Sequence, residues 1–320
     1  MNKFKSVLLS LCVSATMVSA ETLEWTSGQL GGSWYTMSAG IASIIEENNK
    51  NLLIKVVPGG GVTNPSKIEK GKSKIGLSLA PLAYLAMKGQ DVYAGNEHKN
   101  VYMIGQSLMD IKFQFIRAKD AKFDDIGNLL KNGKNQKIGV TKVGSSDEKI
   151  FSWMMKYYGT SYKDLKKRGN SITFANVNEL SSQFKDRMID YAAINTGAPS
   201  GSIIDMLISR DGEISELPID LRKELSTKYS LLETTLEKGL YKGQDKNALT
   251  SNSATVLLVS KKVSEKTVYN ITKAICENQA NLPDIHISMK VFDCKNATLG
   301  NPVPIHPGSM KYYKEMGYVK

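Results

Sequence analysis

The sequence is poor in the residues that build metal centres and catalytic sites. It has three Cys and three His in 320 residues, and it offers neither a Cys-x-x-Cys nor a His-x-x-x-His pair of metal ligands. It also contains no Gly-x-Ser-x-Gly nucleophile elbow. We therefore expect no metal, no cofactor and no enzymatic activity. A hydrolase is the weaker alternative, with His306 as its candidate base, although a histidine between Pro304 and Pro307 is more typical of a structural hydrogen bond.

Long apolar runs are equally scarce, and the most prominent one lies at the N-terminus. Lys3 and Lys5 precede an apolar stretch over 7–13, and small residues follow over 18–20. This order is typical of a secretory signal peptide cleaved after Ala20. No other run approaches the roughly 20 apolar residues that a membrane-spanning helix needs. The sequence thus predicts a signal peptide over 1–20 and a periplasmic mature protein.

The chain has no long block of one charge, although it is basic. It carries 42 Lys and Arg against 31 Asp and Glu, a formal net charge of +11 that falls by two, to +9, when the signal peptide is removed. The lysines are scattered and are not interleaved with aromatic residues, so we expect no nucleic-acid partner. A basic surface of this kind favours small anions at encounter.

Cysteine is too scarce for a disulfide framework. Cys12 is removed with the signal peptide, which leaves Cys276 and Cys294. An exported protein allows a disulfide between them, but the sequence does not give their spacing in the fold. A disulfide and two buried free thiols both remain open.

What the sequence does contain is a strand followed by a Gly-rich loop and a helix. The strand spans 23–26, the loop carries Gly28, Gly31 and Gly32, and helical spacing of apolar residues begins at Tyr35. Unpaired backbone N–H groups at a helix start suit a carboxylate or phosphate, and Ser33 adds a hydroxyl. The glycine spacing is neither that of a dinucleotide fold nor that of a P-loop, so a nucleotide is not expected.

This arrangement recurs along the chain. Further strands are predicted over 52–57, 74–79, 137–140 and 191–195, each followed by a loop of small residues and a helix. In open α/β sheets, ligands bind outside the carboxyl ends of the strands, where such loops gather. The repetition predicts a binding cleft.

The order of the elements predicts two lobes. After β-α-β-α-β-α up to residue 107, we expect strands over 101–105 and 113–116, with the chain crossing to a second lobe near 106–110. Helical spacing covers 218–243. The chain then returns near 247–251, through a strand over 255–259, to a helix over 264–280 that packs on the first lobe. A last helix is expected over 309–316.

The lobes are therefore predicted as 21–107 with 251–320, and as 108–250, with a hinge that allows closure over a ligand.

Five segments in chain order form a set of motifs: Ser27-Gly28 with Gly31-Gly32-Ser33-Trp34-Tyr35, then Gly59 to Asn64, Gly144 to Asp147, Asp190 to Pro199, and His306 to Gly317. This ordered set resembles the motifs of one family, the TAXI-type solute-binding proteins of TRAP (tripartite ATP-independent periplasmic) transporters. Together they cover essentially the whole mature chain.

The resemblance implies a type II-like periplasmic binding protein, an α/β fold of two lobes in which each lobe is a mixed sheet flanked by helices. It implies a monomer that captures a small organic anion, an amino acid or carboxylate, and delivers it to the TRAP membrane permease. A ligand-sensing subunit of a signalling system is the alternative. The chain departs from the family at Leu79-Ala80-Pro81, where Gln-Ser-Asp is common. We therefore expect a partly apolar cleft instead of one shaped for a glutamate-like ligand.

Residues of these loops are the predicted ligand contacts. They are Gly32, Ser33, Trp34, Tyr35, Gly61, Asn64, Ser78, Ser145, Ser146, Thr196 and Gly197.

Overall fold

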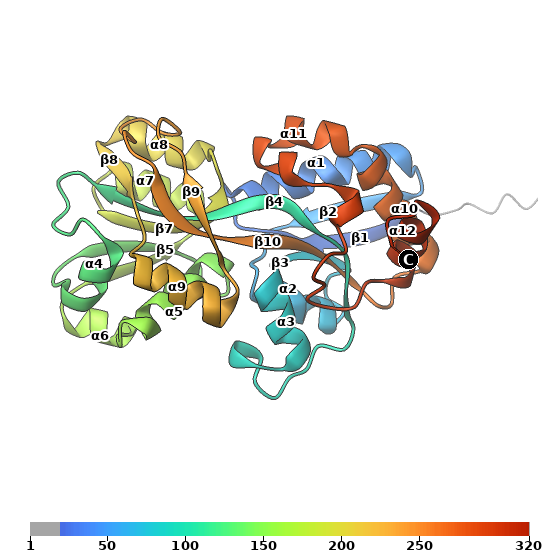
Figure 1. The fold of residues 1–320 in the computed structure, drawn as a ribbon, viewed down its shortest axis with the longest axis horizontal. Coiled ribbons are helices and arrows are strands. Elements are labelled where there is room, and N and C mark those ends of the chain that lie inside the picture. Colours follow the sequence, from blue (N-terminus) through green and yellow to red (C-terminus); the bar gives the residue numbers. More distant parts are fainter. Residues whose placement is uncertain (1–19, 320) are drawn as a thin grey trace, which may run out of the picture.

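The computed structural model describes residues 20–319, and the predicted signal peptide lies almost entirely outside them. The chain forms two lobes of strands and helices, and two long strands run from one lobe into the other (Figure 1). Within the described part of the chain, no helix has both the length and the apolar character needed to cross a membrane.

The first lobe is built from the predicted strand–loop–helix units. Strand β1 (Glu21–Thr26) pairs in parallel with β2 (Leu52–Val57) on one side and β3 (Ile75–Leu79) on the other. Each strand leads into a helix: α1 (Ser33–Asn48), α2 (Thr63–Glu69) and α3 (Ala80–Lys88). All five residues of β3 are buried, as expected for an interior strand covered on both faces. These three units are confirmed.

The strands that join the lobes are longer than predicted. Segment 101–118 is one strand, β4 (Val101–Ala118), instead of two short strands with a crossing between them. It pairs in antiparallel fashion with β10 (Ala248–Ser260), which extends the predicted strand over 255–259 toward the N-terminus. The crossing was predicted near 106–110, but Gln106 and Asp110 both pair with β10 and carry the strand through it. The pairing has a register shift between them, where Ser107 has a φ of 60°.

The second lobe continues the same sheet. Strand β7 (Tyr191–Gly197) pairs with β4, and β5 (Lys137–Thr141) lies in parallel between β7 and β6 (Ser171–Ala175). Strand β8 (Gly212–Ser215) also pairs with β4. The flanking helices are α4 (Ile126–Asn132), α5 (Ser146–Tyr157), α6 (Tyr162–Lys167), α7 (Val177–Lys185) and α8 (Gly201–Ser209). The unit β6–α7 was not predicted.

The expected helical segment over 218–243 is only partly helical. Helix α9 (Ile219–Tyr229) ends at Ser230, whose φ of 54° places it in the left-handed region that terminates helices. The next residues form strand β9 (Leu232–Leu236), which pairs with β10. The leucine spacing indicated a helix, but an open sheet edge was available and Thr234 and Thr235 favour a strand.

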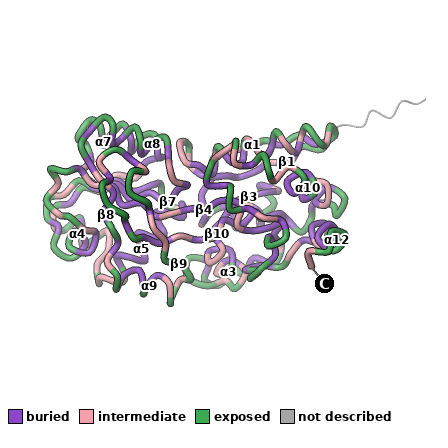
Figure 2. The backbone as a smooth tube through the Cα atoms, turned by 45° about the horizontal axis from the view of Figure 1, so that its top comes forward, coloured by how far each residue is buried: buried purple, intermediate pink, exposed green. Residues whose placement is uncertain are grey.

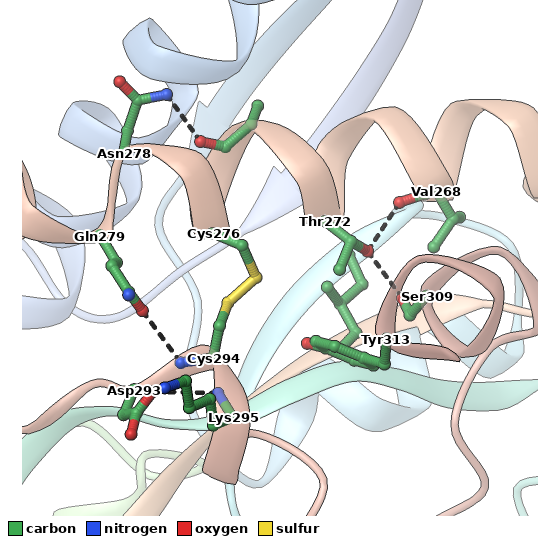
Figure 3. The surroundings of a disulfide bond; sticks show 12 residues. Val268, Thr272, Cys276, Asn278, Gln279, Asp293, Cys294, Lys295, Ser309 and Tyr313 are labelled. Atoms are coloured by element: carbon green, nitrogen blue, oxygen red, sulfur yellow. Dashed lines mark hydrogen bonds between the residues drawn. A yellow bond between two sulfur atoms is a disulfide. The ribbon is translucent and has the colours of Figure 1, made fainter. Parts of the chain in front are cut away.

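The C-terminal helices pack on the first lobe, as predicted for α10 (Glu265–Glu277). Helix α12 (Pro307–Glu315) lies against α10, where the hydroxyls of Thr272 and Ser309 are 2.8 Å apart (Figure 3). A short helix, α11 (Leu282–Ile285), follows α10. Cys276 and Cys294 form a disulfide with their Cα atoms 5.6 Å apart. Of the two possibilities left open by the sequence, a disulfide and a pair of free thiols, the structure has the disulfide.

The core follows the sheet through both lobes. In Figure 2 the buried backbone concentrates on the central strands, and exposed residues lie on the outer helices and loops. The largest buried side chains, among them Trp25, Phe113, Phe115, Tyr191 and Tyr313, lie on β1, β4, β7 and α12. His306 is also buried, and its Nδ1 accepts a hydrogen bond from the Gly308 N–H at the start of α12. That contact is structural, as the flanking prolines indicated.

Candidate functional site

The loop between β1 and α1 reaches from the first lobe to the second. The N–H of Ser33 donates to Thr196 Oγ1 over 3.1 Å, and the two hydroxyls are 2.9 Å apart. The N–H of Gly197 in turn donates to Ser33 Oγ at 2.8 Å. Since Thr196 and Gly197 end strand β7, the start of α1 is bonded directly to the second lobe.

Glycines in this loop and its neighbour allow the close approach. Gly31 has a φ of 81°, and a side chain there would overlap Asn178 of the second lobe. At Gly60, in the loop between β2 and α2, a Cβ would lie 2.5 Å from the carbonyl oxygen of Gly144. The N–H of Val62 donates to that same carbonyl over 3.2 Å. The structure is therefore a closed conformation in which the two lobes touch.

A small cavity lies between these loops. Its volume is about 20 Å³, comparable with the roughly 10–15 Å³ that one water molecule requires. The lining residues come from five loops or strand ends and both lobes; they are Gly28, Gln29, Gly32, Ser33, Trp34, Gly60, Gly61, Ser145, Ser146, Asp147, Val177, Asn195 and Thr196.

Most of the predicted contact residues are brought together at this cavity. Those that line it are Gly32, Ser33, Trp34, Gly61, Ser145, Ser146 and Thr196. Trp34 forms part of its wall and is fixed there, because its indole N–H donates to Thr255 Oγ1 on β10 over 3.0 Å.

The other predicted residues lie behind the lining or beside it. Asn64 is fully buried, and its side-chain amide bonds to the Ser27 and Leu77 carbonyls, to the Gly60 N–H and to the Thr26 hydroxyl. Ser78 donates to the Gly61 carbonyl at 2.7 Å. Gly197 bonds to Ser33, and Tyr35 is half-buried outside the lining. These four hold the loops or flank them, and a direct contact with ligand from any of them stays a prediction.

Three polar residues of the cavity were not predicted: Gln29, Asp147 and Asn195. The side-chain N–H of Gln29 donates to the Gly59 carbonyl over 2.6 Å. Asp147 lies in the first turn of α5, where its carboxylate accepts the Asn195 N–H over 2.8 Å and the Ser146 hydroxyl over 3.1 Å. Burial raises the pKa of Asp147 to about 6, against the hydrogen bonds, which lower it. The Asn195 side-chain Nδ2 is buried and has no hydrogen-bond partner among residues 20–319.

The sequence carries a signal for Asp147 and Asn195. Asp147 belongs to the motif that begins at Gly144, and Asn195 is the last residue of the predicted strand over 191–195. The prediction names only their neighbours Ser145, Ser146 and Thr196.

The cavity has an unusual charge distribution for an anion site. No Lys or Arg side chain of the described chain lines it, and Asp147 is its only charged residue. The groups that an acceptor atom of a ligand would meet are backbone N–H groups at the starts of α1 and α5, hydroxyls and the Asn195 amide. Within residues 20–319 there is also no cluster of three His, Cys, Asp or Glu residues that could hold a metal ion.

This fold is the one found in type II periplasmic binding proteins. The chain is similar to the structure of the periplasmic binding protein BugD, with a TM-score of 0.57 and 11% identity over 93% of this chain and 98% of that one. It is also similar to a binding protein component of an ABC phosphonate transporter from Pseudomonas aeruginosa, with a TM-score of 0.54 and 9% identity over 85% of this chain and 80% of that one.

A comparison of the sequence with models of protein families identifies the family, which these structural likenesses do not. The model of the NMT1-like family matches residues 26–317. The chain therefore belongs to the NMT1-like family.

Proposed function

We propose that this protein captures a small organic anion in the cavity between its lobes and delivers it to the membrane subunits of a TRAP transporter. The observation that carries the proposal is the meeting of the β1–α1 and β5–α5 loops around one small cavity, with two helix starts beside it. Helix N-termini present free N–H groups and a positive dipole end to an anion. The buried Nδ2 of Asn195 supplies a further donor, since buried donors in native proteins normally have a partner.

The protonation state of Asp147 should affect the affinity for such a ligand. An anion beside its buried carboxyl group stabilises the protonated form, so anion binding and proton uptake are coupled. With a pKa near 6 in the ligand-free protein, Asp147 is ionised at pH 8 and repels the ligand. Affinity for an anion should therefore be higher at pH 5.5 than at pH 8. A ligand that also carries an ammonium group beside Asp147 would show the opposite trend.

Capture requires the lobes to open, because the closed cavity is too small for an organic acid. We take 21–107 with 251–320 as one lobe and 108–250 as the other, with β4 and β10 as the connection between them. A ligand larger than a water molecule holds the lobes slightly further apart than the direct Ser33–Thr196 bonds do, and it takes over the donors that these bonds now use. The unit that performs this cycle is a single chain.

Calorimetric titration with amino acids, dicarboxylates and keto acids tests the ligand class. We expect one site per chain for at least one of these anions, with affinity weakened roughly tenfold or more by Asn195→Ala or Ser146→Ala, because each removes a hydrogen bond to a charged group. Ser43→Ala is the matched control, since Ser43 is exposed on α1 and bonds only to the Ala39 carbonyl. Binding of only a neutral sugar or a cation would contradict the anion proposal.

The transporter partner needs a separate test. The ordered motif resemblance supports TRAP membrane subunits, whereas the fold alone is shared with binding proteins of other systems. Uptake of the identified ligand into vesicles that contain the TRAP membrane subunits should require this protein. If the neighbouring genes encode a sensor kinase and no TRAP subunits, the signalling alternative replaces transport.

A further inference from the structure

A second and much larger groove lies between the lobes, away from the small cavity. It is bounded by α3 of the first lobe and by α9 and β9 of the second. Helices α3 and α9 both lie below the crossing strands in Figure 1. Its volume is about 910 Å³, within the range of about 300–1,000 Å³ that small-molecule sites occupy. None of its lining residues lines the small cavity.

The walls of this groove are apolar and come from both lobes. Tyr84 and Leu85 face it from α3, and Tyr229 and Leu232 face it from α9 and β9. Tyr84 is 45% exposed and Leu232 is 61% exposed, which is a high exposure for large apolar side chains that gather at one place. Tyr229 is held rigid by Trp153, on which its ring stacks at 4.1 Å.

The lining also includes a buried polar group that lacks a partner. Ser253 on β10 is 4% exposed, and within residues 20–319 its hydroxyl has no hydrogen-bond partner. Burial of such a hydroxyl carries a desolvation cost, and a ligand that bonds to it removes that cost. Gln106 on β4 also lines the groove and offers an amide to the same ligand.

The charges at the rim favour an anion. Asp91 lines one end, but Lys149 already neutralises it with Nζ 2.9 Å from Oδ1. Lys228 pairs with Glu224 at 3.0 Å. Lys156 also lines the groove, and no carboxylate of the described chain lies within salt-bridge distance of its amine. The amine of Lys156 is thus the rim cation available to a ligand.

We propose that this groove is a second ligand site, which takes a carboxylic acid with an apolar, aromatic or branched body. The body packs between Tyr84 and Leu232, the carboxylate faces Lys156, and a hydrogen-bonding group meets Gln106 and Ser253. Because the walls belong to different lobes, the ligand binds to the closed conformation and stabilises it. The two sites share no lining residue, and the proposal of this site does not rest on the function proposed for the small cavity.

Titration with 4-phenylbutyrate, followed by calorimetry, tests the proposal on the full mature chain. We expect saturable binding of one molecule per chain. The exposed-wall variant Tyr84→Ala/Leu232→Ser should weaken it roughly tenfold or more through lost apolar contact, and Lys156→Gln should weaken it severalfold. The controls Leu53→Ser and Lys163→Gln remove an exposed leucine and an exposed lysine far from the groove, and they should leave binding unchanged.

Asn195→Ala distinguishes the two sites. It should leave 4-phenylbutyrate binding intact, because Asn195 lines only the small cavity. Loss of binding in this variant, absence of saturable binding, or equal affinity in the wall variants would overturn the second site. Because Tyr84, Leu232 and Lys156 are all exposed, these variants are expected to fold, and their thermal unfolding curves verify it.

Discussion

Asp91 and Lys149 join the two lobes outside the lining of the small cavity. Asp91 lies in the short 3₁₀ turn after α3, and its Oδ1 is 2.9 Å from the Nζ of Lys149 on α5. Its Oδ2 accepts the indole N–H of Trp153 at 3.0 Å. Burial alone would raise the pKa of Asp91, but these hydrogen bonds outweigh it and hold the pKa below its usual value. One carboxylate thus binds two side chains of the opposite lobe.

Replacing this carboxylate should favour the open conformation. Asp91→Asn keeps an acceptor for Trp153 and tolerates the left-handed backbone, with φ at 53°, but it removes the charge that pairs with Lys149. Small-angle scattering of the ligand-free protein should give a larger radius of gyration than wild type. Asp245→Asn, at an exposed position, should match wild type. An unchanged radius in Asp91→Asn would show that this pair does not hold the lobes together.

Gly60→Ala should block closure without weakening either lobe. The added Cβ would meet the Gly144 carbonyl at 2.5 Å and the Ser145 Cα at 3.0 Å, and both atoms belong to the second lobe. The open protein avoids this clash, so we expect an unfolding temperature close to that of wild type together with a loss of ligand affinity of tenfold or more. Gly201→Ala is the control, because a Cβ there meets nothing within 4 Å. Normal affinity in Gly60→Ala would mean that the ligand is bound without full closure.

Asp147→Asn should stabilise the ligand-free protein at neutral pH. The folded-state pKa of Asp147 is about 6, above the ordinary value of 3.8, so folding costs free energy once the unfolded chain ionises. The contribution of Asp147 to the free energy of unfolding of the wild type should therefore be most favourable at low pH. It should become less favourable as pH rises from about 4 to about 6. The loss is roughly 2–3 kcal/mol at about 1.4 kcal/mol per pKa unit.

Urea unfolding at pH 4.5 and pH 8 measures this effect. Asn at position 147 can still accept from the Asn195 N–H, and the variant should be more stable than wild type at pH 8 by about that amount. The idea fails if the variant is no more stable at pH 8, or if wild type and variant respond identically to pH.

The Cys276–Cys294 disulfide should contribute to the stability of the first lobe. It closes a loop with a sequence separation of 18, for which the chain-entropy account gives about 3 kcal/mol. The variant Cys276→Ala/Cys294→Ala should lose roughly that free energy of unfolding by urea titration, with ligand affinity retained because both residues lie outside the cavity. A loss of affinity at full folding would connect this region to the site.

The sequence predicted the strand–loop–helix units and the cleft well, because both depend on local signals. Apolar runs such as 52–57 and small-residue loops such as Gly59 to Gly61 produce their structure over a few residues. The type II periplasmic fold followed from the resemblance, and the structure bears it out.

Elements decided by distant partners were predicted less well. Strand β4 contains Gln106 and Asp110, and only its pairing with β10 shows that it is one strand. Strand β9 looked helical because the sequence does not show that β10 offers it an edge. For the same reason Asn64, a typical ligand-contacting type of residue, is placed by tertiary structure behind the loops it supports.

The hinge region is a paired ladder, and this determines what opening costs the molecule. Strands β4 and β10 remain hydrogen-bonded along the connection, with register shifts at Ala254/Val256 and Leu257/Leu258 that loosen the pairing locally. A two-stranded ribbon of this kind can bend and twist while each backbone group keeps its partner. If the lobes open as the proposed function requires, release of a ligand would need no local unfolding, and the apolar core of each lobe would stay out of contact with water. Repeated opening would then expose no additional core surface to proteases or to aggregation.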